Sequence, residues 1–409
     1  MSWVDVPAGS DFPVENLPFG VVKPLDQTAA PTVAVAIGDD VLDMAALAEA
    51  GLLDGLDLPP DTFAGPTLNP FLVVGPEVWS ATRKRLTDLL TDPAHERAVR
   101  PALRPATAVE NLLPIQVGDF VDFYSSEHHA TNLGRILRPG GEPLALNWRQ
   151  LPVGYHGRSG TVVVSGTPVN RPAGLVVDGE GPAQRIPTRM LDLEVEVGFV
   201  IGPGNRPGHP IRPDEADRHV FGTVLVNDWS ARDIQAFEYQ PLGPFLAKSF
   251  ATTISPWVVP LEALRPHLVA PPRQVDPVPD RYLQAARPWG LDLHLEAELN
   301  GTTITRTGFA DMYWTFAQQL AHMTGNGATV RPGDLYASGT VSGSQPGSYG
   351  SLMEITWRGR DPIELADGTV RTFLRDGDTV TIRGWCGGDD GPRIGLGAAV
   401  GTVSPAVEE

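Results

Sequence analysis

Between positions 191 and 201, hydrophobic and polar residues alternate along the chain. The odd positions are all apolar, whereas the even positions begin with Asp192, Glu194 and Glu196. A period of two predicts a half-buried β-strand with one apolar and one polar face. A second apolar run, residues 220–227, predicts another strand, and Asp228 stands at its end.

The acids of these two strands, Glu194, Glu196 and Asp228, permit two interpretations. Residues on the same face of a strand lie roughly 6.5–7 Å apart, so flexible Glu side chains can converge on one ion. Neighbouring carboxylates repel each other unless a cation or protons lie between them, and Mg²⁺ and Ca²⁺ prefer carboxylate oxygen. The alternative is a solvated polar face on an edge strand. The spacing leaves both interpretations open.

The N-terminal part of the chain has the pattern of a separate small unit. Short strands are expected at 19–22 and 33–43, and helices at 43–51 and 76–92. The second helix begins with a proline and is followed by another, as is typical of helix boundaries. Residues 97–111 are rich in Pro and Ala and are interpreted as a linker. These features predict two domains, residues 1–112 and residues 113–409.

Residues 119–132 are unusually rich in acids, hydroxyls and histidines. Strand spacing would place Asp122 and Tyr124 on the same face, and His129 is expected on the following turn or loop. Histidine is the side chain best suited to moving protons near neutral pH. The segment is therefore either a catalytic site or a hydrogen-bonded corner. The neighbouring His128 is interpreted as a surface or structural residue.

Polar groups also occur in the segments that flank the second strand. Tyr155 lies in a Gly/Pro turn, where it either bonds a ligand or anchors the turn. After Asp228 the pattern becomes helical, and Arg232 and Gln235 share one helical face. Asp228 itself stands where a helix N-cap would, a role that is compatible with ligation. Lys248 is an isolated base among apolar and hydroxyl residues, a setting that favours a paired or functional lysine.

The C-terminal part is again rich in predicted strands. A hairpin is expected over 291–304 with a turn at Asn300 and Gly301. Residues 312–324 predict an amphipathic helix. Residues 351–357 predict a strand with Glu354 pointing inward. Together with the N-terminal pattern, this indicates a mainly β (α+β) protein.

Composition and charge narrow the class of protein. The chain is 42% hydrophobic and 20% charged, which is ordinary for a globular protein. A net charge of −18 argues against non-specific nucleic-acid binding, which depends on Lys and Arg. No signal peptide is expected, and no run approaches the roughly 18 apolar residues of a membrane span. The single cysteine, Cys386, fits a reducing compartment, so we expect a cytoplasmic protein without membrane contact.

Several stretches, in this order, resemble the fumarylacetoacetase (fumarylacetoacetate hydrolase) family. They are residues 122–126 (DFYSS), 129–132 (HATN), 152–158 (PVGYHGR), 226–235 (VNDWSARDIQ), 241–250 (PLGPFLAKSF) and 337–340 (ASGT). The resemblance covers essentially all of residues 112–409, and the N-terminal part is similar more loosely. It implies a small N-terminal SH3-like barrel domain, a C-terminal mixed β-roll and a homodimer.

The resemblance also implies roles for individual residues. The metal ligands, for Ca²⁺ or Mg²⁺, would be Asp122, Glu194, Glu196 and Asp228. The general base would be His129, with Glu354 as its orienting partner. The groups around the substrate carbonyl and the leaving carbanion would be Arg232, Gln235 and Lys248. The substrate contacts would be Tyr124, Arg138, Tyr155, Tyr239 and Thr340.

The activity that the resemblance implies is hydrolysis of the C–C bond of fumarylacetoacetate, an anionic diketone, to fumarate and acetoacetate. This is the last step of tyrosine and phenylalanine catabolism. Such a cleavage needs a base for water, a Lewis acid for the ketone oxygens and positive groups for the departing carbanion. The alternatives are a related acylpyruvate or 1,3-diketone hydrolase or decarboxylase on the same scaffold, and a metal-dependent acid-binding protein without turnover.

Overall fold

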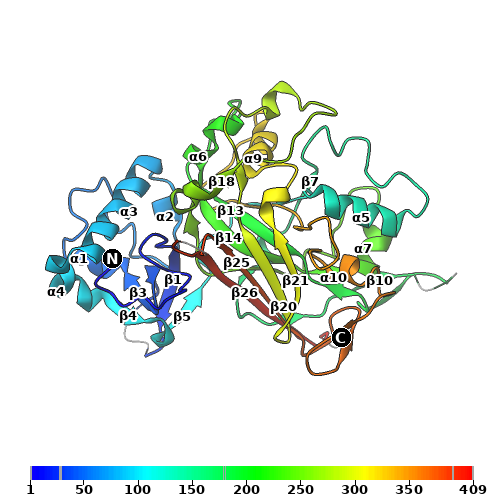
Figure 1. The fold of residues 1–409 in the computed structure, drawn as a ribbon, viewed down its shortest axis with the longest axis horizontal. Helices are drawn as coiled ribbons and strands as arrows, with labels where there is room; N and C mark the ends of the chain where they lie inside the picture. Colours follow the sequence, from blue (N-terminus) through cyan, green and yellow to red (C-terminus); the bar gives the residue numbers. More distant parts are fainter. Residues whose placement is uncertain (1, 27–29, 178, 180, 389–390, 408–409) are drawn as a thin grey trace.

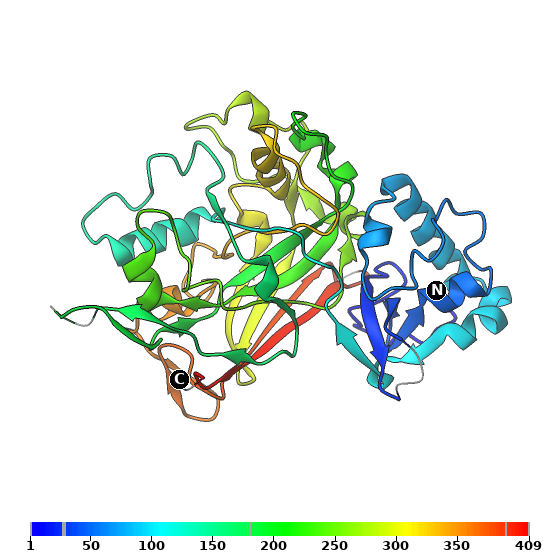
Figure 2. The same cartoon turned by 180° about the vertical axis from the view of Figure 1, so that it is seen from behind.

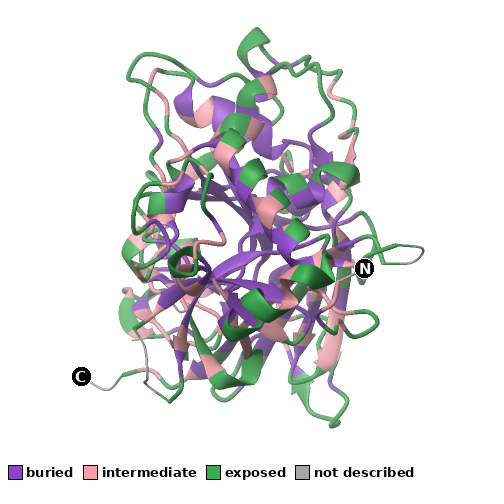
Figure 3. Ribbon diagram, turned by 90° about the vertical axis from the view of Figure 1, so that its left-hand side faces the viewer, coloured by how far each residue is buried: buried purple, intermediate pink, exposed green. Residues whose placement is uncertain are grey.

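The computed structural model describes residues 2–26, 30–177, 179, 181–388 and 391–407. A smaller N-terminal part lies beside a larger C-terminal part that is built around long central strands (Figures 1 and 2). Figure 3 shows that these strands are buried, whereas the exposed residues lie mainly on the outer helices and loops. Among the described residues, every helix is too short or too polar to cross a membrane.

The N-terminal part contains an antiparallel half-barrel sheet with the strand order β4-β3-β2-β1-β5. Its strands are β1 (Phe19–Pro24), β2 (Thr32–Ile37), β3 (Asp40–Asp43), β4 (Leu103–Pro105) and β5 (Val109–Leu112). Its helices are α1 (Met44–Glu49), α2 (Asn69–Leu72), α3 (Pro76–Thr91) and α4 (Glu96–Val99). The predicted strands and the two predicted helices are confirmed.

The interpretation of residues 97–111 as a linker is wrong. These residues form the end of α4 and supply both edge strands of the N-terminal sheet. Leu103 in β4 pairs with Leu42, and Leu112 in β5 pairs with Val21. Their prolines misled the interpretation, because proline is tolerated at the ends of short edge strands.

The C-terminal part has two main sheets. The larger follows the order β7-β6-β22-β13-β14-β16-β8, with β17 also paired to β14, and the smaller follows the order β21-β20-β25-β26-β9. The larger contains β6 (Phe120–Phe123), β7 (Gly154–His156), β8 (Val162–Val164), β13 (Val195–Ile201), β14 (Val220–Asp228), β16 (Thr252–Ile254), β17 (Val259–Pro260) and β22 (Leu335–Ala337). The smaller contains β9 (Val169–Asn170), β20 (His294–Leu299), β21 (Thr302–Gly308), β25 (Thr379–Cys386) and β26 (Ile394–Ser404).

Short strand pairs and helices complete this part. The pairs are β10 (Ala173–Val176) with β11 (Gln184–Pro187), β12 (Leu191–Asp192) with β15 (Ser230–Ala231), β18 (Leu268–Val269) with β19 (Gly290–Leu291), and β23 (Ile363–Glu364) with β24 (Val370–Arg371). The helices are α5 (Glu127–Leu137), α6 (Ala216–His219), α7 (Arg232–Glu238), α8 (Leu261–Leu264), α9 (Phe316–Thr324) and α10 (Leu352–Ile355).

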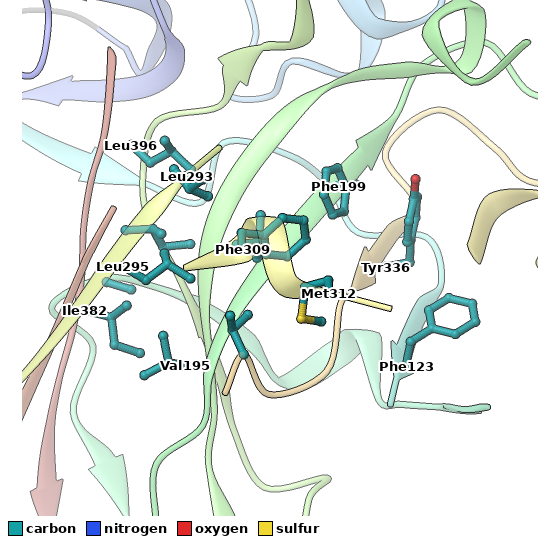
Figure 4. Packing of buried hydrophobic residues seen from close by; sticks show 14 of the residues in the cluster. Phe123, Val195, Phe199, Leu293, Leu295, Phe309, Met312, Tyr336, Ile382 and Leu396 are labelled. Carbon is teal, nitrogen blue, oxygen red and sulfur yellow. The ribbon is translucent and has the colours of Figure 1, made fainter. Parts of the chain in front are cut away.

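The alternating strand predicted at 191–201 is real, but it is not half-buried. Strand β13 lies in the interior of the larger sheet between β14 and β22, and every one of its residues is buried. Its odd positions, such as Phe199, pack against the smaller sheet and helix α9 (Figure 4). Its even positions face the other side of the sheet, where Glu196 is fully buried. The interpretation as a solvated edge strand is therefore wrong.

The even-numbered face of the larger sheet has two regions. At one end, Val200, Val224 and Leu335 join the hydrophobic core of the N-terminal part. At the other end the same face carries Glu196 and Asp228. Because side chains on a strand repeat with a period of two, one face can bind a neighbouring domain and also present the acids.

The two parts of the chain share one hydrophobic core where they meet. Phe221 of β14 contacts Phe19, Phe71 and Trp79, with ring centroids 5.7, 5.7 and 5.1 Å away. Phe19 also forms an isolated β-bridge with Val258. The N-terminal part is thus fixed to the larger sheet by apolar packing and by backbone hydrogen bonds.

Three further predictions for the C-terminal part can be compared with the structure. The hairpin of β20 and β21 turns at Asn300 and Gly301, as predicted, with φ of 50° and 77°. Helix α9 is also confirmed. Glu354, however, lies on helix α10 rather than on a strand, because the Ser351 side chain caps the first turn and accepts from the Glu354 amide. Cys386 ends strand β25 and is buried.

The shared core predicts that the two parts unfold together. Phe221→Ala should lower the free energy of unfolding by about 3–5 kcal/mol, because it removes a buried aromatic ring between them. Calorimetry should show one transition at a lower Tm. Leu25→Ala, at a site 59% exposed, serves as the control and should unfold like the wild type. Two separate transitions in the wild type would contradict this prediction.

Candidate active site

Four buried carboxylates converge at the polar end of the larger sheet. Asp122 comes from β6, Glu194 directly precedes β13, Glu196 lies within β13, and Asp228 ends β14. One oxygen from each lies within 4.8 Å of the others. The predicted set is therefore brought together by three strands, although Asp122 and Asp228 are 106 residues apart in sequence.

The carboxylates differ in their hydrogen-bond partners. Among the described residues, no donor reaches Asp122 Oδ1 or either oxygen of Glu196. Burial, followed by the repulsion of the neighbouring acids, raises the pKa of both groups well above the usual range. Burial also acts on Glu194, but Lys248 and Arg232 outweigh it and lower the pKa of that carboxyl. Asp122 Oδ1 and the two Glu196 oxygens thus have no hydrogen-bond or ion-pair partner among the described residues.

This arrangement fits a hard divalent cation. All available donors are carboxylate oxygens, which Mg²⁺ and Ca²⁺ prefer. The oxygens without partners belong to buried acids, and a buried polar group without a partner is costly. A cation among the four acids would supply the missing partner, so the cluster can hold a divalent ion.

Two basic side chains neutralise the opposite side of the cluster. Lys248 Nζ bonds both Glu194 Oε2 and Asp228 Oδ2, the latter at 2.5 Å. Arg232 Nη2 donates to Glu194 Oε1 at 2.8 Å, and its Nη1 donates to Gln235 Oε1 at 3.2 Å. Because the nearby acids outweigh burial, the pKa values of Lys248 and Arg232 are raised. The prediction of a paired lysine is confirmed, as is the shared face of Arg232 and Gln235.

His129 lies beside the four acids, and Glu354 fixes its ring through Nδ1. Its Nδ1 is 2.7 Å from Glu354 Oε2, and its Nε2 is 3.9 Å from Glu194 Oε1. Burial would raise the pKa of Glu354, but His129 and hydrogen bonds from Asn132 and Ser351 together lower it. Since an ionised carboxylate only accepts, Nδ1 donates to Glu354, and Nε2, which faces Glu194, is the acceptor nitrogen of the neutral ring.

Helix α5 explains this placement. The sequence predicted a turn or loop at His129, but the residue lies in the first turns of the helix, which Ser126 caps by accepting from the His129 amide. His128 is only half-buried, and the structure therefore distinguishes the two adjacent histidines. Asn132, three residues after His129, donates to Glu354 Oε1 at 3.0 Å.

Some of the predicted substrate contacts lie against the acids or His129, and others do not. Tyr155 donates to Asp228 Oδ2 at 3.1 Å. The Tyr124 ring meets that of His129 edge-on with centroids 5.3 Å apart, and Thr340 is buried. Arg138 is exposed and donates to the carbonyl of Pro143, and the Tyr239 hydroxyl accepts from Gln240. Neither Arg138 nor Tyr239 forms a hydrogen bond or an ion pair with the four acids.

Asp228 is not a helix cap, in contrast to one sequence interpretation. Strand β14 runs through Asp228, β15 follows, and the N-cap of α7 is Ala231. The Asp228 side chain instead accepts from Tyr155, Lys248 and Thr252, the last at 3.1 Å.

The sequence analysis missed several residues that support the site. Glu354 accepts from Ser342 and Ser351, each at 2.9 Å, and Arg232 donates to Asp192 at 2.8 Å. Asp192 is two residues before Glu194 and so was expected on the same face of the strand, but nothing else in the sequence indicated a role for it. The serines carried no signal, because their contacts depend on tertiary structure.

A cavity of about 310 Å³ reaches the cluster from outside. Tyr155, Asp228 and Lys248 line its inner wall. Arg158 and Phe245 also line it, and the Arg158 guanidinium lies 5.5 Å from the Phe245 ring centroid. The cavity gives a small molecule access to these groups. Arg158 and Lys248 place positive charge in its lining, although the protein as a whole is acidic.

Comparison with known proteins identifies the family. The model "Fumarylacetoacetate (FAA) hydrolase C-terminal" matches residues 120–404, and "Fumarylacetoacetase N-terminal" matches residues 15–114. The chain belongs to the fumarylacetoacetate hydrolase family. It is 46% identical to the fumarylacetoacetases of Mus musculus, over 100% of this chain and 99% of the relative, and of Arabidopsis thaliana, over 99% and 98%.

The fold is also similar to that of a solved structure. A fumarylacetoacetate hydrolase from Exiguobacterium antarcticum superposes with a TM-score of 0.55, at 16% identity, over 95% of this chain and 99% of that one. At this level of identity the likeness concerns the fold alone. It supports the mainly β (α+β) class predicted from the sequence.

The acid cluster generates a prediction about metal ions. Adding Ca²⁺ or Mg²⁺ to chelator-treated protein should raise the Tm, because the ion binds the folded chain; the gain is about 2.7 kcal/mol at 100 times the Kd. Glu196→Gln should abolish most of this shift and should not lower the Tm of the metal-free protein, since it removes a repelling charge.

Asp119→Asn is the matched control, because the side chain of Asp119 is 63% exposed and lies just before β6. It should keep the full shift. An unchanged Tm on addition of either ion to the wild type would contradict the cation site.

Proposed function

We propose that this protein hydrolyses the C–C bond of fumarylacetoacetate to give fumarate and acetoacetate, in tyrosine and phenylalanine catabolism. The observation that carries the proposal is the His129–Glu354 pair, whose free Nε2 lies 3.9 Å from the acid cluster. Full-length relatives named fumarylacetoacetase in animals and a plant support the choice of substrate.

The proposed metal ligands are Asp122, Glu194, Glu196 and Asp228, for Ca²⁺ or Mg²⁺. When bound, the cation supplies Lewis acidity to the ketone oxygens of the diketone. The fit of an all-oxygen buried cluster supports this assignment. The ligand set alone does not distinguish the two ions, because both prefer oxygen.

In the proposed reaction, His129 acts as the general base. Its Nε2 takes a proton from water, and the hydroxide adds to the carbonyl of the fumaryl group. When this carbonyl re-forms, the C–C bond breaks and its electron pair leaves with the acetoacetate enolate, whose carbon takes the proton from His129 Nε2. Glu354 accepts from Nδ1 and stabilises the imidazolium that forms. Asn132, Ser342 and Ser351 hold Glu354 in the orientation that this requires.

The proposed role of Lys248, Arg232 and Gln235 is to stabilise the leaving acetoacetate enolate. Lys248 and Arg232 both remain protonated because the surrounding acids raise their pKa values. Fixed positive charge and hydrogen-bond donors at the position where negative charge develops lower the barrier without reorganisation. Gln235 accepts from Arg232 through its Oε1, so its amide group remains available to donate.

The proposed substrate contacts are Tyr124, Arg138, Tyr155, Tyr239 and Thr340. Tyr124 and Tyr155 have support from the structure, since one ring lies against His129 and the other hydroxyl bonds Asp228. Arg138 and Tyr239 are accessible and carry groups that suit an anionic diketone. Their assignment rests on the family resemblance.

We also propose the division into domains 1–112 and 113–409, a homodimer and a cytoplasmic location. The family models match residues 15–114 and 120–404, which divide the chain within a few residues of this boundary. The location is supported by the single buried cysteine. The homodimer is supported by four exposed apolar side chains that are close in sequence on and after α7, with exposed fractions of 46%, 96%, 60% and 46%: Phe237, Leu242, Phe245 and Leu246.

The role of His129 can be tested by measuring fumarylacetoacetate consumption from its ultraviolet absorbance. His129→Ala should lower kcat by roughly 10²–10⁴-fold, because that is the usual contribution of a general base. His128→Ala is the matched control and should keep wild-type turnover, since its side chain is half-buried and adjacent in sequence.

A His129→Ala protein with most of its turnover would contradict the role of this residue. A folded wild type that leaves fumarylacetoacetate intact but cleaves another acylpyruvate or 1,3-diketone would contradict the substrate.

The role of these exposed side chains in a dimer can be tested through the molecular mass in solution. Wild-type protein should elute as a dimer in size-exclusion chromatography with light scattering. Leu242→Glu should yield monomers, because it places a charge at the most exposed of the four apolar side chains. Val73→Glu, at a site 55% exposed on the N-terminal part, should remain dimeric. A dimer that persists in Leu242→Glu would place the interface elsewhere.

A further inference from the structure

Asp192 is a buried acid without a role in the proposed reaction. It lies on β12, two residues before Glu194, and its side chain is fully buried. Both of its oxygens are used. Oδ1 accepts from the amides of Leu193 and Leu352 at 2.8 and 2.7 Å, and Oδ2 accepts from Arg232 Nε and the Met353 amide at 2.8 and 3.1 Å.

The partners of Asp192 belong to the two halves of the proposed machinery. Arg232 also contacts Glu194 and Gln235 on the side of the cation and the leaving group. Leu352 and Met353 begin helix α10, which carries Glu354 and thereby fixes His129. The Asp192 carboxylate therefore links Arg232 to helix α10, whose Glu354 fixes the proposed base His129.

These contacts form a closed ring. From Asp192 it passes to Arg232, then to Glu194 at 2.8 Å, and then to His129 at 3.9 Å. From His129 it continues to Glu354 at 2.7 Å and returns to Asp192 through the first amides of α10. Every side chain in this ring is buried, so none of its contacts is loosened by exchange with water.

We propose that Asp192 is a positioning residue that sets the distance between Arg232 and the His129–Glu354 pair. This inference rests on the proposed function for its kinetic consequence, but the geometry that carries it does not depend on the substrate. The residue touches neither substrate nor cation. It acts by holding Arg232 Nε and helix α10 on one rigid carboxylate.

The position requires an acid rather than an amide. An Asn side chain has one oxygen, which can accept from the Leu193 and Leu352 amides, and an NH₂ group that only donates. It would leave Arg232 Nε and the Met353 amide unpaired and facing another donor. Arg232 and the start of α10 would then shift relative to each other, with little change in side-chain volume.

The chain offers a matched control for loss of a buried Asp–Arg pair. Asp378 is 2% exposed and accepts from Arg371 Nε and Nη2, both at 2.9 Å, from the Arg375 amide and from Asn300. None of these partners belongs to the proposed site. Asp378→Asn therefore reproduces the structural loss without touching the ring.

The first test compares Asp192→Asn with Asp378→Asn in the full chain with Ca²⁺ or Mg²⁺ present. Asp192→Asn should lower kcat by roughly 10²-fold, as expected for a small misplacement of a catalytic group, with a much smaller change in KM. Asp378→Asn should keep the wild-type kcat. An Asp192→Asn protein that matches Asp378→Asn in kcat and KM would overturn the proposal.

A second pair removes one contact of Asp192 without changing any charge. Leu352→Pro deletes the amide that donates to Oδ1, and proline is tolerated at the first position of a helix. Leu352→Ala loses the same buried side chain but keeps the amide. Leu352→Pro should show the lower kcat of the two, and equal values would overturn the proposal even if Asp192→Asn does not fold.

A spectroscopic readout separates this inference from the choice of substrate. The downfield proton resonance of His129 Nδ1–H, identified by its loss in His129→Ala, should shift or broaden in Asp192→Asn and Leu352→Pro but not in their controls. An unchanged resonance in both variants would overturn the proposal. If the wild type does not cleave fumarylacetoacetate, the proposed function fails, and the resonance alone decides the role of Asp192.

Discussion

The burial of four carboxylates at one end of a β-sheet is the constraint on which the rest of this site depends. Charges of the same sign that are removed from water repel strongly, and each loses its hydration. Lys248 and Arg232 compensate Glu194 and Asp228 through short contacts. Asp122 and Glu196 have no such partner among the described residues, and a divalent cation held by the four acids would complete the balance. The same acids keep Lys248 and Arg232 protonated.

One face of the larger sheet therefore serves both stability and chemistry. Its apolar end packs against Phe19, Phe71 and Trp79 of the N-terminal part, and its polar end holds the acids. The rigid packing matters for the site, since β6, β13 and β14 each contribute an acid and must keep their register. The described residues of the N-terminal part supply none of the acids, so this part contributes by packing against the sheet that carries them.

The patterns that predicted structure correctly were local. Alternation predicted strand β13, proline boundaries predicted helix α3, and Asn300 with Gly301 predicted a hairpin turn. The wrong predictions concerned features that depend on the tertiary surroundings of a segment. Alternation looks the same whether the polar face meets water or a buried ionic cluster, so β13 was expected to be half-buried. Residues 97–111 read as a linker because their pairing partners lie on distant strands.

The sequence by itself determined the chemical groups and the family to which they belong. The spacing of Glu194 with Glu196, and of Arg232 with Gln235, follows from the periods of strand and helix. The family resemblance had paired His129 with Glu354, 225 residues away, but only the tertiary structure decided that Nδ1 meets Glu354 and Nε2 lies toward the acids. It also decided that Asp192 joins Arg232 to α10. Such contacts depend on the order of strands in a sheet and on how a short helix packs against it, and local sequence patterns do not encode either.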